Sequence, residues 1–266
     1  MHILGYIAAI GIGLSLGLVG GGGSILTVPV LVYLFGIDPT VATAYSLVII
    51  SATTSVGAFK NYQKQLVSFP VAFSFGLSSM ITVFLIRKLI LPAIPTTLFN
   101  IGSVIIHKSE ATMLVFALLM LVAAYFMIKT KPTVQQVDEV SSSVAKLLLY
   151  GIGAGLITGF LGAGGGFVLI PALVLLVHLP MKKAVGTSLL IIALNSLVGI
   201  AGDWGHVTLD WVFAASLIAL ALLGLFIGVL LSASLPDTLL KKYFGWFVCC
   251  MGIVVLSSEL YSLLLK

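Results

Sequence analysis

The chain has 266 residues, of which 60% are hydrophobic and only 8% are charged. An ordinary soluble domain has roughly a quarter charged residues, so a water-soluble fold could not bury this much apolar surface. The net charge of +5 does not indicate a nucleic-acid partner, because the lysines lie between apolar segments, where they orient a membrane protein. The composition therefore predicts a polytopic membrane protein in contact with the lipid bilayer.

Ten apolar elements follow one another along the chain. They span residues 3–19, 24–36, 40–59, 69–91 and 111–128, and then 144–161, 167–178, 184–201, 209–233 and 240–264. The second element of each set has about a dozen residues, and at ~1.5 Å per residue it is too short to cross a hydrocarbon core of about 30 Å. We expect an all-α fold of eight to ten helical segments, in which these two are short, Gly-flanked half-helices.

The sequence repeats itself at a constant offset, the one that carries Pro29 onto Pro171. We call this offset the repeat spacing. The run Gly20–Ser24 before the first proline matches the run Gly162–Gly166 before the second. A duplication of this length predicts two homologous halves. We expect a first transmembrane repeat over residues 1–129, a polar linker over 130–143, and a second transmembrane repeat over 144–266.

The basic residues indicate how the two halves are oriented. If the first two elements of each half form one span, the 13 basic residues divide seven to six between the two sides of the membrane. If that pair enters and leaves on one side, nine residues share a side and four lie opposite. Short loops on the cytoplasmic side carry the excess of Lys and Arg, so the uneven division predicts an inverted repeat.

The glycine runs are the first candidate site. Neither run is followed by the Lys of a phosphate-binding loop, and non-helical backbone at membrane depth is tolerated only where it is buried or lines a wet cavity. Glycines let a ligand approach the main chain, and the helix that follows directs its N–H groups at an anion. The alternative is that glycines allow helices to pack closely. We favour this alternative for the three pairs of glycines four residues apart that begin at Gly13, Gly155 and Gly224. The predicted substrate-binding residues here are Gly20, Gly22, Gly23, Ser24, Gly162, Gly164, Gly165 and Gly166.

Polar residues in the third element of each half are the second candidate. Their spacing of seven places Ser46 and Thr53, like Ser188 and Asn195, two turns apart on one helical face. Together with Thr187, these groups could complete the coordination of an oxyanion. The alternative is that they bond their own helix or a neighbouring one.

Ionisable residues follow the third element of the second half. Asp203 and His206 are candidates for proton coupling, because intramembrane carboxylates and imidazoles mark proton relays. The alternative is an interfacial anchor. The sequence has no metal-ligand spacing, nucleophile elbow or paired-carboxylate site within the spans, so we expect no metal, no cofactor and no enzymatic activity.

The duplicated glycine motif and the Ser-bearing helix resemble the TauE/SafE family, also called the sulfite exporter or toluene sulfonate uptake permease family. The resemblance rests on Gly17-x-x-Gly20-x-Gly22-Gly23 through Pro29, on Gly159-x-x-Gly162-x-Gly164-Gly165 through Pro171, and on Ala184-x-Gly186-Thr187-Ser188-Leu189. In the first half, Tyr45-Ser46 stands where the second half has Thr187-Ser188. The resemblance implies a multi-pass carrier of the bacterial or archaeal inner membrane for sulfur-containing anions.

The sequence therefore predicts a secondary transporter for a small oxyanion such as sulfite, a sulfonate or thiosulfate, bound near the midplane. The alternatives are an anion channel or a non-transporting membrane scaffold. The coupling ion, proton or sodium, and the formation of a homo-oligomer are left open, as are the identity of the anion and the direction of transport.

Overall fold

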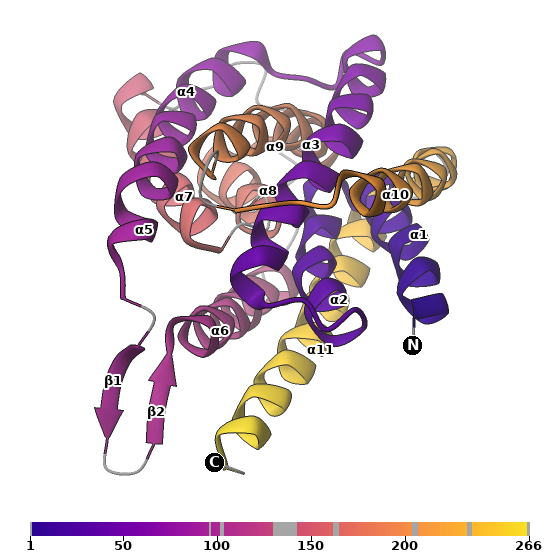
Figure 1. Ribbon diagram of the computed structural model, residues 1–266. Helices are drawn as coiled ribbons and strands as arrows, with labels where there is room; N and C mark the ends of the chain where they lie inside the picture. The colour runs from indigo at the N-terminus through magenta and orange to yellow at the C-terminus, as the bar shows by residue number, and fades with distance from the viewer. Residues whose placement is uncertain are drawn as a thin grey trace.

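The computed structural model describes residues 2–95, 97–101, 104–129, 143–161, 165–203, 207–232 and 236–264. Helices make up most of the fold (Figure 1). The first part contains α1 (His2–Val19), the 3-10 helix η1 (Gly20–Leu26), α2 (Thr27–Tyr33), α3 (Pro39–Gln63), α4 (Phe69–Leu85), the π-helical turn η2 (Ile86–Ile90), α5 (Leu91–Ala93) and α6 (Lys108–Lys129). The second part contains α7 (Val144–Leu161), α8 (Gly166–Leu175), α9 (Met181–Asp203), α10 (Trp211–Ser232) and α11 (Asp237–Leu264).

One short hairpin interrupts the helices. Strand β1 (Thr97–Ile101) pairs antiparallel with β2 (Val104–His107) between α5 and α6. Figure 1 shows it extending away from the helices, at the lower left. The sequence predicted helices only, so this hairpin was not expected.

Five described helices are long and apolar enough to cross a membrane: Pro39–Gln63, Phe69–Ala93, Val144–Leu161, Met181–Asp203 and Trp211–Ser232. Among them α3 and α9 are the most enclosed. In the most apolar 18-residue stretch of each helix, 78% of α3 and 67% of α9 is buried, against 39% for α7 and α10. The core therefore lies around α3 and α9, which pack against each other. The short elements α2 and α8, of seven and ten residues, lie where half-helices were expected.

Several helix bounds follow the repeat spacing found in the sequence. Helix α7 begins and ends one repeat spacing after α1. Helix α9 begins one repeat spacing after α3. Helix α10 covers the positions that correspond to α4 and η2 together.

The contacts between the two parts also occur in matching pairs. Helix α1 packs against α10, and α4 packs against α7. A methyl group at Gly13 of α1 would lie 1.8 Å from the carbonyl oxygen of Ala221 in α10. A methyl group at Gly155 of α7 would lie 2.7 Å from the carbonyl oxygen of Ser79 in α4. Gly155 and Ser79 correspond to Gly13 and Ala221 at the repeat spacing, so the same close contact of small residues is made twice.

Candidate functional site

The two glycine segments cross in direct contact. A methyl group at Gly166 would lie 1.7 Å from the carbonyl oxygen of Gly21, and one at Gly21 would lie 1.9 Å from the Cδ1 atom of Ile192 in α9. Residues 20–26 form the 3-10 helix η1 rather than the unwound loop expected from the sequence. The crossing therefore joins η1 and the start of α8 to the middle of α9.

In each glycine segment, a described residue lies in the left-handed region. The φ angle of Gly20 is +74° and that of Gly165 is +67°, a conformation that only glycine adopts readily. Gly20 packs against Val185, and a methyl group at Gly165 would lie 1.8 Å from the hydroxyl oxygen of Thr158. The remaining members of the predicted set are placed as follows: Gly23 packs against Ser15 and Leu16, Gly22 lies within η1, and Gly162 and Gly164 lie outside the described residues.

Four of the predicted hydroxyl groups are buried and donate to backbone carbonyl groups within four residues of their own position. The donors and acceptors are Ser24 to Gly21 at 2.7 Å, Ser46 to Thr43 at 2.8 Å, Thr53 to Ile49 at 2.8 Å, and Ser188 to Val185 at 2.9 Å. These bonds are the alternative that the sequence left open for such residues.

Thr187 instead joins the two halves. Its Oγ1 atom accepts a hydrogen bond of 2.9 Å from the backbone N–H of Ser68, just before α4. The Tyr45 hydroxyl oxygen accepts one of 2.7 Å from the backbone N–H of Asp210, just before α10. Thr187 and Asp210 correspond to Tyr45 and Ser68 at the repeat spacing. The Tyr that departs from the family pattern therefore makes the same kind of contact as its Thr counterpart.

Several buried polar atoms near the crossing have no hydrogen-bond partner. Asn195 donates from Nδ2 to the Ser79 hydroxyl at 2.7 Å, but its Oδ1 atom is unpartnered. The hydroxyls of Ser196, Thr158 and Thr27 are also fully buried and unpartnered. These groups belong to α9, α7 and the start of α2, all of which contact η1 or α8. A buried polar group without a partner costs about 1–3 kcal/mol, so these four groups are candidates for contact with a ligand.

A second polar group lies at the end of α9. Asp203 forms an ion pair of 2.5 Å with Nη1 of Arg87, and Nε of Arg87 donates to the carbonyl oxygen of Gly159 at 2.9 Å. Arg87 is 1% exposed and Asp203 is 13% exposed. The charge count made from the sequence treated Arg87 as a charge near the end of a span, and the structure pairs its guanidinium with Asp203 inside the protein. His206, the other proposed proton-coupling residue, lies outside the described residues.

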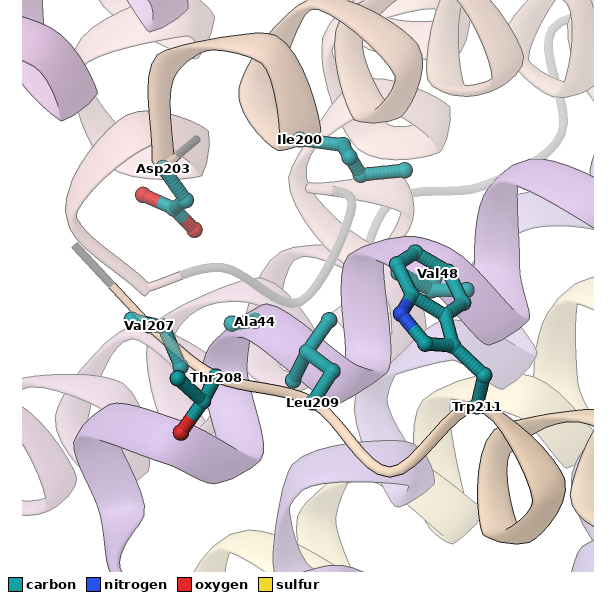
Figure 2. Close-up of a pocket in the computed structure, with 8 residues that line it drawn as sticks. All are labelled: Ala44, Val48, Ile200, Asp203, Val207, Thr208, Leu209 and Trp211. Atoms are coloured by element: carbon teal, nitrogen blue, oxygen red, sulfur yellow. The ribbon is translucent and has the colours of Figure 1, made fainter. Parts of the chain in front are cut away.

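Two cavities flank the pair of α3 and α9. The Asp203 cavity, of about 290 Å³, is lined by Ala44, Val48, Ile200, Asp203, Val207, Thr208, Leu209 and Trp211. Figure 2 shows Asp203 at one end of it and Trp211 at the other. The Tyr62 cavity, of about 480 Å³, is lined by Ser55, Ala58, Phe59, Tyr62, Val67, Phe69, Leu190, Ala193, Leu194 and Leu197. Neither cavity is lined by the predicted glycines.

Several residues that line the two cavities correspond to each other at the repeat spacing. Val48, Leu209 and Trp211 of the Asp203 cavity correspond at the repeat spacing to Leu190, Val67 and Phe69 of the Tyr62 cavity. The charges do not correspond. Asn61 stands where the second half has Asp203, and Val229 stands where the first half has Arg87.

Comparison with known proteins agrees with this architecture. The model of the sulfite exporter TauE/SafE family matches residues 5–255. The chain belongs to this family. A probable membrane transporter protein of Xylella fastidiosa (strain 9a5c) is 31% identical over 258 residues, covering 95% of this chain and 94% of that protein. The probable membrane transporter protein YdhB of Bacillus subtilis (strain 168) is 24% identical over 248 residues, covering 92% and 96%. No solved structure matches the chain.

As a member of this family, the protein is a multi-pass membrane transporter. Two residues of its candidate site were not found from the sequence, Arg87 and Tyr45. Arg87 had a usable signal, because it stands next to Lys88 inside the apolar segment Phe69–Ala93, and an ionisable residue within a span is a functional candidate. Tyr45 had a weaker one, its correspondence to Thr187 at the repeat spacing.

Proposed function

We propose that this protein is a secondary transporter of the inner membrane for a small sulfur-containing oxyanion such as sulfite, a sulfonate or thiosulfate. The family description names sulfite export, and the relatives are described only as probable membrane transporters. The substrate is therefore our proposal. The observation that carries it is the crossing of the two glycine segments near buried, unpartnered hydroxyl groups.

An oxyanion suits this crossing for a chemical reason. The free hydroxyls of Thr158, Ser196 and Thr27 can donate hydrogen bonds, and an oxyanion offers several acceptor oxygens. The tight backbone contact between Gly21 and Gly166 leaves no space there for a bulky ligand. We propose that the described arrangement is a closed state, and that the segments separate when the anion binds.

We further propose that the halves form an inverted repeat and that transport proceeds by alternating access. The matching contacts of α1 with α10 and of α4 with α7 support a two-fold relation between the halves. The corresponding Asp203 and Tyr62 cavities support two access routes, one from each side of the membrane. In such a carrier, one half rocks against the other around a central site.

Flux measurements test the proposed activity. The protein, reconstituted in proteoliposomes, is assayed for uptake of sulfite, thiosulfate, sulfoacetate, taurine and sulfate. A carrier should show saturable uptake that accelerates when the same anion is present on the opposite side. Flux without this trans-stimulation would indicate a channel, and absence of both flux and anion-dependent stabilisation would indicate a scaffold.

Two substitutions test the proposed site. Thr158→Val and Ser196→Ala each remove an unpartnered buried hydroxyl, so they should leave the melting temperature unchanged or raise it while lowering anion uptake. The matched control is Ser216→Ala in α10, whose hydroxyl already donates to the carbonyl of Phe213. Uptake equal to wild type in both test variants would argue against the site.

A further inference from the structure

Arg87 is a buried cation whose hydrogen bonds are incomplete. The guanidinium group is 1% exposed, with Nε donating to Gly159 and Nη1 paired with Asp203. Its third nitrogen, Nη2, is buried and has no hydrogen-bond partner. A guanidinium carries five N–H donors in a planar fork suited to two oxygens of one anion. The protein therefore holds an anion-binding group that a single carboxylate does not fill.

The backbone around Arg87 is itself unusual. Arg87 belongs to the π-helical turn Ile86–Ile90, which interrupts the span Phe69–Ala93. Such turns are rare and occur frequently at functional sites, because they redirect a side chain that a regular helix would send elsewhere. The neighbouring Lys88 does not share the site, since its ammonium group lies 5.2 Å from the ring centre of Phe84.

The other half of the chain shows that the fold does not need these charges. At the corresponding positions stand Val229, which is buried, and Asn61, which bonds the carbonyl of Gly57 in its own helix at 2.9 Å. Burying an ion pair is costly, and replacing one with uncharged residues is often neutral or stabilising. Packing alone therefore does not account for Arg87 and Asp203.

The pair adjoins open space. Asp203 lines the Asp203 cavity of about 290 Å³, which is large enough for a small oxyanion. The carboxylate of this cavity-lining residue is paired with the buried guanidinium of Arg87. Two anions compete for one cation, so binding requires Asp203 to release Nη1.

We propose that Arg87 binds the transported anion and that Asp203 occupies the guanidinium until the anion displaces it. This inference rests on the proposed transport of an oxyanion and adds the charged group that recognises it. Once Asp203 leaves, Nη1 and Nη2 can donate two parallel hydrogen bonds to the anion, which is a bidentate contact. The glycine crossing would then receive the anion after its capture in the Asp203 cavity.

The test compares substitutions of the two partners. Purified protein is titrated with sulfite and with thiosulfate, and the half-saturating concentration is read from thermal shifts. Arg87→Gln together with Asp203→Asn removes both charges, so the protein should fold while its anion affinity falls about tenfold or more. Asp203→Asn alone should bind anion several-fold more tightly than wild type, because the competing carboxylate is gone. Lys88→Gln is the matched control and should bind like wild type.

A purely structural ion pair gives a different pattern. Both single substitutions would then lower the melting temperature, and the double substitution would restore it with anion affinity unchanged, which would overturn the inference. Weaker anion binding by Asp203→Asn would overturn it as well. In both cases anion flux by the wild type would keep the proposed function intact. Wild-type protein that neither binds nor transports any of these anions would refute both proposals.

Discussion

The carbonyl oxygen of Gly21 lies against the Cα atom of Gly166, so that a methyl group at Gly166 would approach this oxygen to 1.7 Å. The two residues are far apart in the chain and belong to the two matching glycine segments. The Gly21 oxygen is also held by the Ser24 hydroxyl at 2.7 Å. This hydrogen bond fixes the Gly21 oxygen within η1, on one side of the contact with Gly166.

Gly166→Ala should destabilise the protein by about 1–3 kcal/mol, because the added methyl group meets a fixed backbone atom. The check is the melting temperature of the purified protein, with Gly153→Ala as the control, since a methyl group there meets nothing within 4 Å. An unchanged melting temperature in Gly166→Ala would show that the segments separate freely.

Gly13→Ala and Gly155→Ala should each destabilise the protein, because both glycines allow close approach of a partner helix. A built methyl group lies 1.8 Å from the Ala221 oxygen at Gly13 and 2.7 Å from the Ser79 oxygen at Gly155, so the first change should cost more. The controls are Gly11→Ala and Gly153→Ala, where the space is open. Equal melting temperatures for tests and controls would contradict the packing described for these helices.

Tyr45→Phe and Thr187→Val should each cost about 1–3 kcal/mol of stability, because each leaves a backbone N–H of the other half without its acceptor. Both substitutions keep the shape of the side chain. The check is thermal unfolding, with Thr43→Val as control, since that hydroxyl bonds only within its own helix. Tolerance of both changes would mean that water replaces the lost acceptors.

A cysteine at Thr208 and one at Val67 should react with a membrane-impermeant maleimide from opposite sides of the membrane. Thr208 lines the Asp203 cavity and Val67 lines the Tyr62 cavity. The proposed inverted repeat places these cavities on opposite faces. The variants are made in a background without Cys249 and Cys250 and labelled in oriented vesicles. Labelling from the same side would rule out inversion.

The helices were largely predictable from the sequence. The expected elements 3–19 and 144–161 correspond to the helices His2–Val19 and Val144–Leu161. A long apolar run in lipid must satisfy its own backbone hydrogen bonds, so it forms a helix, and both runs end just before a glycine. The hairpin Thr97–His107 was missed because its two strands are short and lie between strongly apolar segments. Its cue was the Gly102-Ser103 pair between β-branched residues.

The candidate site was predicted less well than the fold. Repetition located Gly21 and Gly166 in sequence, but their contact depends on how two halves dock, which no local pattern encodes. The position of Arg87 within an apolar segment marks it as a functional candidate, but its partner Asp203 lies 116 residues away in the chain. A buried ion pair of this kind depends on tertiary structure rather than on spacing along one helix.

The ion pair of Arg87 and Asp203 has no charged counterpart at the corresponding positions of the chain. At the repeat spacing, Arg87 corresponds to Val229 and Asp203 corresponds to Asn61. If the halves are inverted, a copy inserted upside down would expose its charged entrance to the wrong compartment. Substrate capture would then differ between outward and inward flow, so this carrier would run more easily in one direction than in the other.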